Sequence, residues 1–324
     1  MPSIKEIQAP VSDEMKVFSG HFREILSSDV ALLDTIMRYI VKRKGKQMRP
    51  LFVFLSAKLH GGCTEKTYTA ASLIELLHTA TLVHDDVVDE SNMRRGFFSI
   101  QALWKKKVAV LVGDYLLSRG LLTAVDAEAF DLLKLTSRAV KEMSEGELLQ
   151  IEKARHLDIT EEVYFEIIKR KTASLISACC ACGAASTDAS KEQIDKMWAF
   201  GEKTGLAFQI KDDLLDLGHG TKTGKPTGQD IREKKITLPL IHTLKNTDRR
   251  TRKKIIRMVK RAPKDPDAVK WVMNAIIEGP GIEYARVKMA ELRNDAVNML
   301  DAFEDTDSRK ALINMLDFTI ERTR

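Results

Sequence analysis

Hydrophobic residues recur at intervals of three and four almost from one end of the chain to the other, and alternating patterns typical of β-strands are scarce. This periodicity predicts helices that pack through their apolar faces. The expected helices cover 11–26, 30–41, 51–59, 65–89, 106–125, 128–153, 160–186, 190–217, 236–245, 249–261, 266–277, 282–304 and 307–321. The pattern therefore predicts an all-α fold, a bundle of ten or more helices.

Glycine and proline mark the breaks between these segments. Gly45 interrupts the pattern before Pro50, and Gly61 with Gly62 ends the next apolar run. Later prolines also fall between helical runs: Pro226, Pro239, Pro263, Pro266 and Pro280. No linker or low-complexity segment divides the chain, so we expect a single helical domain over residues 1–324.

The composition is that of a globular protein, with 44% hydrophobic and 30% charged residues among 324. The net charge of +6 could suggest nucleic acid, but the basic residues are spread out and few aromatic residues lie among them. A mildly basic enzyme with polyanionic substrates fits better, and we expect no nucleic-acid partner.

The cysteine pattern, together with an N-terminus that does not resemble a targeting signal, predicts a cytoplasmic protein. Cys179, Cys180 and Cys182 crowd into one apolar helix and Cys63 stands alone, which is typical of buried thiols in a reducing compartment. The N-terminus has no apolar signal core, and no run approaches the roughly 20 apolar residues of a membrane span. We therefore expect a cytoplasmic protein without a transmembrane segment.

Three aspartates end the most apolar helix, residues 65–89. Asp85 and Asp89 lie one turn apart on one face, with Asp86 beside them. Like charges held this closely favour a divalent cation. Arg94 and Arg95 follow, and arginine pairs suit a diphosphate. Taken alone, the cluster could equally be solvated surface.

A second copy of the spacing makes plain surface charge an unsatisfactory explanation. Asp212, Asp213 and Asp216 repeat D-D-x-x-D at the end of another apolar helix. If both helices point into one cavity, their carboxylates form an acidic rim that can hold several hard cations with substrate oxygens between them.

Several short basic motifs accompany the two clusters. Lys46 and Arg49 precede Pro50 at a helix start, where the helix dipole also favours an anion. Lys171 and Thr172 lie within a helical run. Lys225 lies in the glycine-rich loop after the second cluster, and Lys235 lies just before Thr237-Leu238-Pro239. Each lysine alone would be interpreted as a solvated surface residue.

In this order the motifs resemble those of the trans (all-E) isoprenyl diphosphate synthases, most of all the long-chain, octaprenyl-type members. The matching segments are GKQMRP, LLHTATLVHDDVVDESNMRRG, GDYLLS, EGELLQ, KTASL, GLAFQIKDDLLD, GKPTGQD and KKITLPL. The resemblance implies the isoprenoid synthase fold, with helices around a central cavity, and a homodimer. It also implies condensation of isopentenyl diphosphate with an allylic diphosphate such as farnesyl diphosphate, with magnesium.

The resemblance also assigns roles to individual residues. It implies that the direct ligands of about three Mg²⁺ ions are Asp85, Asp89 and Asp212. It implies that Asp86, Asp213 and Asp216 support these ligands. It implies that the allylic diphosphate is held by Arg94, Lys171, Gln209, Lys225 and Lys235, with Thr172 beside them. It implies that isopentenyl diphosphate is held by Lys46, Arg49, His78 and Arg95.

Two assignments leave alternatives. The family often has glycine where this chain has Lys234, so either Lys234 or Lys235 could reach the phosphate; we favour Lys235 because it keeps the distance to Thr237. His78 could be a core histidine, but it lies seven residues before Asp85 and so on the same helix face.

The family chemistry explains these residue types. Magnesium neutralises the leaving diphosphate as the allylic C–O bond ionises, and the double bond of a correctly oriented isopentenyl diphosphate attacks the carbocation. Loss of a proton, which the resemblance assigns to the released diphosphate, completes the reaction. No Ser/His/Asp or Cys/His nucleophile is required.

The length of the product should depend on the helix that carries Asp85. Ala80 and Thr81 precede the aspartates and are small, where short-product members of the family commonly carry aromatic residues. We therefore expect a product longer than a C20 chain, serving as a quinone side chain. Alternatively, Leu116 or Leu117 on the following helix closes the tunnel early, as in farnesyl or geranylgeranyl diphosphate synthases.

Other protein classes explain the pattern less well. A terpene cyclase would carry one D-D-x-x-D and a different second metal motif. A non-catalytic partner subunit of a heteromeric synthase would be expected to lose aspartates, and this chain retains both clusters. A prenyltransferase also allows peripheral association with a membrane for product release.

Overall fold

Helices make up nearly all regular structure in the part of the chain that the computed structural model describes, which is residues 3–42, 45, 47–94, 96–156, 159–218 and 227–321. In chain order the elements are α1 (Ile4–Gln8), a 3₁₀ turn (Ala9–Val11), α2 (Ser12–Ile25), α3 (Ala31–Lys42), α4 (Met48–Leu59), α5 (Glu65–Val88), β1 (Met93–Arg94), β2 (Phe97–Phe98), α6 (Ile100–Asp126), α7 (Phe130–His156), α8 (Glu161–Ile168), a π-helical turn (Lys169–Ala173), α9 (Ser174–Ala185), α10 (Lys191–Asp216), α11 (Gln229–Arg232), α12 (Leu238–Lys245), α13 (Arg249–Arg261), α14 (Pro266–Ile277), α15 (Gly281–Leu300) and α16 (Asp307–Glu321). The prediction of an all-α fold with ten or more helices is confirmed.

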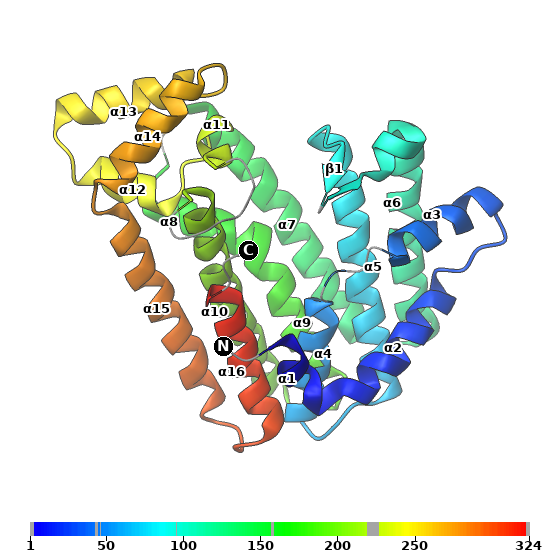
Figure 1. Ribbon diagram of the computed structural model, residues 1–324. Helices are drawn as coiled ribbons and strands as arrows, with labels where there is room; N and C mark the ends of the chain where they lie inside the picture. The colour runs from blue at the N-terminus through cyan, green and yellow to red at the C-terminus, as the bar shows by residue number, and fades with distance from the viewer. Residues whose placement is uncertain are drawn as a thin grey trace.

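The long helices run roughly side by side, with α9 and α10 at the centre (Figure 1). The most extensive packing joins α5 to α6, and α10 to α9 and α15. Every residue of α9 is buried. Helix α10 approaches it closely at Gly201, where a Cβ atom would lie 2.5 Å from Cα of Ser177. Small residues therefore allow the central helices to pack almost backbone to backbone.

The three clustered cysteines lie in α9 and form no disulfide; Cys63, half-buried, is also free. Burial raises the pKa of the Cys179 thiol to about 12, so it stays protonated and inert. The interpretation of this cluster as buried thiols is confirmed.

Several helix ends differ from those expected by a few residues, the short helices α1 and α11 were not expected, and two long runs contain local departures. Helix α6 begins at Ile100 rather than residue 106, but Lys105 has a non-helical φ of 73°, so a short first segment precedes a kink. The run expected as one helix over 160–186 is continuous but contains the π-helical turn at Lys169–Ala173. Sequence periodicity did not predict either local departure.

A small antiparallel hairpin was not predicted. Its two-residue strands pair Met93 with Phe98 and Arg94 with Phe97. Strands this short cannot show an alternating pattern, so periodicity gives no signal for them. The hairpin follows the first aspartate cluster and places Arg94 next to it.

Helix α6 is long and apolar enough to span a membrane by length and composition alone, although the sequence analysis found no such run. One face packs on α5, where Gly113 faces His84 and Gly120 faces Leu73. The other face exposes apolar side chains, among them Val110, Leu111, Leu121, Leu122 and Val125.

Candidate active site

The first aspartate cluster lies at the C-terminal end of α5, where its three carboxylates have different environments. Asp85 and Asp89 are exposed, whereas Asp86 is only 5% exposed. Nε of Arg94 donates to Oδ1 of Asp86 at 2.6 Å, a charge-assisted contact. Gln101 donates to the backbone oxygens of Asp86 and Ser91 and so ties the loop to α6.

The second cluster ends α10 and has other partners. Asp213 is 4% exposed and accepts from the hydroxyl of Tyr164 at 2.6 Å and from Nε2 of Gln209 at 3.0 Å. Thr172 in turn donates to Oε1 of Gln209 at 2.7 Å. Asp212 is half-buried beside this network.

Asp216 has a structural task in the returning chain. Its carboxylate accepts the backbone N–H of Gln229 at 3.0 Å and that of Asp230 at 2.9 Å. It therefore fixes the start of α11 and brings Asp230 next to the second cluster.

Negative charge accumulates at this end of α10. Burial, reinforced by the charge of Asp230, raises the pKa of Asp213 to about 8. Burial and the charge of Asp216 raise the pKa of Asp230 to about 6. Lys235 lies 3.8 Å from Asp230, but Asp213 forms no ion pair within the described residues, and carboxyls crowded in this way favour the binding of a metal ion.

Two cavities contain most of the expected binding residues. The first, the α5 cavity, has a volume of about 180 Å³. Arg49, His78, Asp86 and Arg94 line it together with apolar side chains such as Phe22 and Phe98. His78 is 9% exposed and faces this cavity, so it is not simply a core histidine.

The second, the α10 cavity, has a volume of about 140 Å³. Five expected residues line it: Lys171, Thr172, Gln209, Asp213 and Lys235. Lys235 is held by Glu233 at 2.5 Å. Lys234 does not line the cavity and has a left-handed φ of 58°, a conformation that glycine adopts without strain.

Asp85 lines neither cavity, but its carboxyl is affected by charged residues of both. Burial and the charge of Glu147 raise the pKa of its carboxyl, while Arg94 and Lys171 oppose that rise. Arg94 lines the α5 cavity and Lys171 lines the α10 cavity. Although Asp85 remains accessible to solvent, it is within electrostatic reach of a cation on each side.

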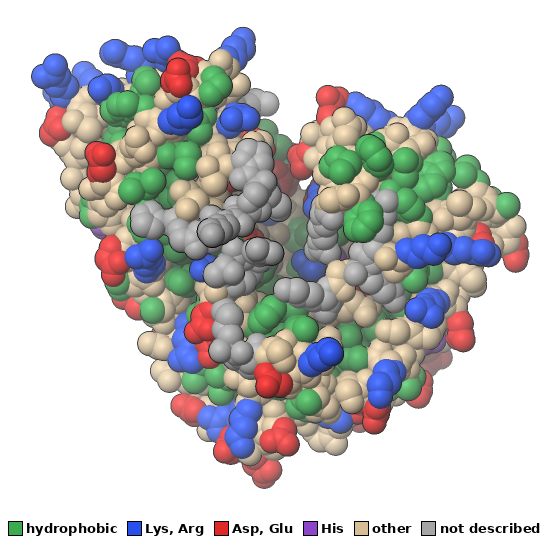
Figure 2. Space-filling model, viewed as in Figure 1, with side chains coloured by type: hydrophobic (Ala, Val, Ile, Leu, Met, Phe, Trp, Pro, Cys, Tyr) green, Lys and Arg blue, Asp and Glu red, His purple; other side chains and the backbone are tan. Residues whose placement is uncertain are grey.

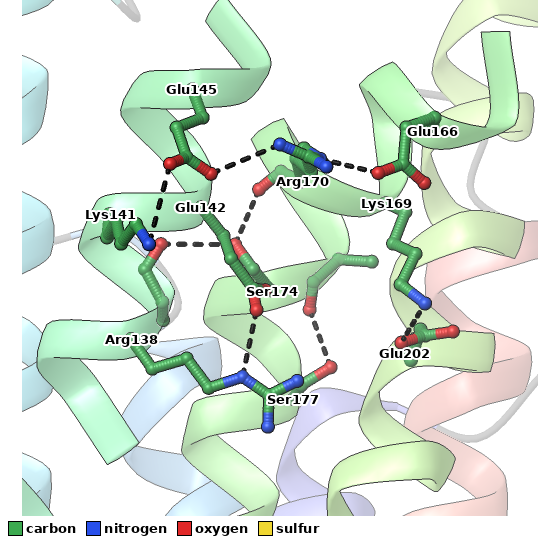
Figure 3. Close-up of polar contacts among 12 residues, drawn as sticks. Arg138, Lys141, Glu142, Glu145, Glu166, Lys169, Arg170, Ser174, Ser177 and Glu202 are labelled. Atoms are coloured by element: carbon green, nitrogen blue, oxygen red, sulfur yellow. Dashed lines mark hydrogen bonds and ion pairs between the residues drawn. The ribbon is translucent and has the colours of Figure 1, made fainter. Parts of the chain in front are cut away.

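The π-helical turn between α8 and α9 positions Lys171 and Thr172. Figure 3 shows Arg170 bridging Glu166 of α8 and Glu145 of α7, at 2.5 and 3.1 Å. Gly146 lies under this turn, where a Cβ atom would be 2.7 Å from the backbone nitrogen of Lys171. The extra residue of the π-helical turn and the close approach of α7 together direct Lys171 towards Glu147, its ion-pair partner.

Sequence reasoning gave no role to four residues that the structure places in the site. Glu147 and Gln150, from the EGELLQ segment, contact Lys171. Tyr164 holds Asp213, and Asp230 lines the α10 cavity. EGELLQ and GKPTGQD already contained three of them, but nothing in the sequence distinguished Tyr164 from a core tyrosine.

Three expected residues, Lys46, Arg95 and Lys225, lie outside the described residues. The other expected diphosphate-binding side chains line one of the two cavities.

The carboxylates fit magnesium only if a substrate contributes ligands. Within the described ranges, no three side chains of His, Cys, Asp or Glu lie close enough together to hold a metal ion by themselves. Mg²⁺ is usually bound through one or two carboxylates plus water and substrate phosphates, and the exposed Asp85, Asp89 and half-buried Asp212 offer such hard oxygen donors.

The chain-length positions lie on two faces of α5. Thr81 is half-buried on the side of Asp85, whereas Ala80 is fully buried. Ala80 is one turn from both Leu76 and His84, which pack on Gly120 and Gly113 of α6. A tail that passes Ala80 must therefore run along the junction of α5 and α6, where Leu116 is also fully buried.

Comparison with known proteins agrees with this geometry. The family model described as Polyprenyl synthetase matches residues 30–276. The chain is 36% identical over 320 residues to the all-trans-nonaprenyl-diphosphate synthase (geranyl-diphosphate specific) of Rhodobacter capsulatus, covering 98% of each. It is 34% identical over 323 residues to the octaprenyl diphosphate synthase of Escherichia coli (strain K12), covering 99% of this chain and 100% of that protein.

A solved structure has the same fold. The polyprenyl synthase of Caulobacter crescentus CB15, complexed with calcium and isoprenyl diphosphate, aligns with a TM-score of 0.91 at 32% identity, covering 99% of this chain and 98% of that one. The expected isoprenoid synthase fold is thereby confirmed. From the two aspartate clusters, the two cavities and these full-length similarities it follows that the chain belongs to the polyprenyl synthetase family.

Proposed function

We propose that this protein joins isopentenyl diphosphate head to tail to an allylic diphosphate by a magnesium-assisted carbocation mechanism. As a member of its family the chain is a prenyltransferase, and its long-chain relatives support a long all-trans polyprenyl diphosphate as the product. One observation carries the mechanism: each of the two cavities is lined by basic side chains together with the buried aspartate of one D-D-x-x-D cluster.

The two cavities suit the two substrates. Lys171, Gln209 and Lys235 in the α10 cavity would hold the allylic diphosphate, next to the aspartates of α10. Arg49 and His78 in the α5 cavity would hold isopentenyl diphosphate. Its apolar wall, including Phe22 and Phe98, would pack on the isopentenyl carbons and keep water from the developing carbocation.

The described geometry supports divalent cations at the aspartates. Bound Mg²⁺, about three ions as in the family, would neutralise the leaving diphosphate. Asp85, Asp89 and Asp212 would be the ligands. Lys171 and Lys235 would bind phosphate oxygens once they leave the carboxylates of Glu147 and Glu233.

The test is incorporation of labelled isopentenyl diphosphate into farnesyl diphosphate with magnesium. We expect long prenyl products with magnesium and none after chelation with EDTA. The absence of any incorporation would overturn the proposal. Terpene hydrocarbons without isopentenyl diphosphate would indicate a cyclase instead.

Chain length can be tested at the α5–α6 junction. Ala80→Phe should shorten the product set by several isoprene units, because the ring would occupy space between α5 and α6. Product chromatography after dephosphorylation measures this. A distribution identical to that of the wild type would show that Ala80 does not border the tail.

The alternative floor of the tunnel can be tested in parallel. If Leu116 limits the chain, Leu116→Ala should lengthen the products while Ala80→Phe leaves them unchanged. Opposite outcomes for the two variants therefore decide which residue limits growth.

We also propose a homodimer formed through the outer faces of α6 and α7. Leu111 and Leu122 of α6 are 58% and 49% exposed, and Phe130 and Leu148 of α7 are 60% and 67% exposed. Apolar exposure on this scale marks an interface. A cytoplasmic location is supported by the four free cysteines. Light scattering that gave the mass of one chain at micromolar concentration would contradict the dimer.

A further inference from the structure

Helix α13 carries an unusual concentration of positive charge. Its thirteen residues include eight basic and no acidic side chains. All eight are exposed, whereas Ile255 and Val259 on the opposite face are buried. Because the whole chain has a net charge of +6, the rest of the molecule is slightly acidic. The eight charges of α13 therefore exceed the net positive charge of the whole protein, although other basic residues are spread along the chain.

Most of this charge is not neutralised by neighbouring side chains. Arg261 pairs with Asp265 at 2.7 Å, and Lys254 lies 4.5 Å from the ring centre of Trp271. In the described part of the chain, the other six form no ion pair: Arg249, Arg250, Arg252, Lys253, Arg257 and Lys260. In contrast, Arg138 and Lys141 on α7 each pair with a glutamate one turn away. The α13 cations are thus available to an external polyanion.

The position of α13 in the molecule is a second observation that bears on its role. Helix α13 and the β1–β2 hairpin both reach the upper edge of the molecule, on opposite sides (Figure 1). Figure 2 shows a hollow between the two upper lobes; Lys and Arg side chains project from the top of the left lobe, and the right lobe has a cluster of hydrophobic side chains together with some basic ones. In the hairpin Met93 is 52% and Phe98 55% exposed, Val88 at the end of α5 is 73% exposed, and Phe98 also lines the α5 cavity.

We propose that this edge of the molecule docks on the anionic surface of a lipid bilayer, with α13 contacting lipid headgroups and the hairpin contacting the acyl boundary. The buried apolar face of α13 packs on α14, so the helix would contribute charge without inserting. The exposed hairpin residues would add a shallow apolar contact.

The inference rests on the proposed function in one respect. A long polyprenyl chain is insoluble in water, so its release is easiest where the mouth of the site faces a bilayer. Nucleic acid would match the charge of α13, but it offers no apolar phase for the exposed hydrophobic side chains of the hairpin. The observations therefore favour a lipid surface.

The experiment measures co-sedimentation of the full-length protein with vesicles. One set contains phosphatidylcholine alone, and the other contains phosphatidylcholine with phosphatidylglycerol. We expect binding to the anionic vesicles only, weakening as salt increases. Equal binding to both sets, or binding to neither, would overturn the proposal.

Matched variants locate the contact. Arg250→Gln, Lys253→Gln and Arg257→Gln combined remove three charges from one face of α13, and half-maximal binding should then require at least about tenfold more anionic lipid. The control combines Lys5→Gln, Arg23→Gln and Lys191→Gln, which removes three exposed charges from α1, α2 and α10. Similar losses in both triple variants would indicate net charge alone and contradict a docking face.

Two further measurements complete the test. Met93→Ser should reduce the binding that remains at high salt. Tighter binding of the wild type to duplex DNA than to the vesicles, abolished in the α13 variant, would assign the helix to nucleic acid and overturn the lipid proposal. Prenyl transfer in detergent should be unchanged in the α13 variant, so loss of docking and failure of the proposed function are distinguishable.

Discussion

The C-terminal ends of α5 and α10 carry the same D-D-x-x-D spacing but stabilise it differently. In both clusters the second aspartate is buried, at 5% for Asp86 and 4% for Asp213. Asp86 is neutralised by Arg94 at 2.6 Å. Among the described residues, Asp213 accepts only from the neutral donors Tyr164 and Gln209, and burial together with the charge of Asp230 raises its pKa.

The third aspartates differ as well. Asp89 is exposed at the C-cap of α5, whereas Asp216 is committed to the backbone of Gln229 and Asp230. The α5 end thus presents two accessible carboxylates and carries its own counter-charge. The α10 end keeps an excess of negative charge that a cation must balance. The same motif therefore performs two tasks, which are determined by its neighbours.

The largest loss of activity is expected when one accessible carboxylate is removed from either cluster. Asp85→Asn and Asp212→Asn should each lower kcat/KM roughly a thousandfold, because losing a metal ligand costs about 4 kcal/mol of transition-state stabilisation. Initial rates with labelled isopentenyl diphosphate at saturating magnesium measure this. Activity within tenfold of the wild type for either variant would remove that residue from the ligand set.

A smaller effect is expected from a substitution that should change substrate binding in the α10 cavity alone. Gly146→Ala places a methyl group 2.7 Å from the backbone nitrogen of Lys171, so the π-helical turn must shift at a cost of about 1–3 kcal/mol in unfolding free energy. The KM for the allylic substrate should rise several-fold while the KM for isopentenyl diphosphate stays unchanged.

The control is Gly20→Ala in α2, where no atom lies within 4 Å of the added carbon. It should leave both KM values unaltered and slightly stabilise the helix. An equal rise in both KM values for Gly146→Ala would show that the two cavities are not independent.

Removing one neutral hydrogen-bond donor from Asp213 should have a smaller effect on the α10 end. Tyr164→Phe leaves Asp213 with a single donor and should reduce the unfolding free energy by about 1–2 kcal/mol. We also expect a higher magnesium requirement, because Tyr164 positions the cluster that receives the metal. Tyr115→Phe is the control, since its hydroxyl makes only a 3.5 Å contact with Ser27. A magnesium dependence identical to that of the wild type would limit Tyr164 to a structural role.

The smallest effect concerns pH in the absence of metal. The pKa of Asp213 is about 8 in the folded protein and 3.8 as the reference value. The folded state therefore holds an extra proton between these values, and the unfolding free energy should rise by about 1 kcal/mol as pH falls from 8 to 7. Urea denaturation in EDTA measures it, and Asp213→Asn should lose this dependence. A stability that falls over this range in the wild type, with no difference from Asp213→Asn, would contradict the assigned environment.

Much of the site was predictable because its motifs are local. Helical spacing placed Asp85 and His78 on one face, and the structure brings His78 and Arg49 into one cavity. The preference for Lys235 over Lys234 agrees with the cavity lining, since Lys234 has the left-handed backbone. Tyr164 was not predictable, because its contact with Asp213 joins residues 49 positions apart.

The sequence by itself determined the helices, the two acidic helix ends and the type of chemistry. Periodicity and charge spacing act within a few turns of one helix, so they can be read without knowing the fold. Only the tertiary structure decided which aspartate is neutralised by arginine, how the π-helical turn directs Lys171, and that Ala80 faces α6. These features depend on helices that are distant in sequence and meet through close packing, a long-range property that no local pattern encodes.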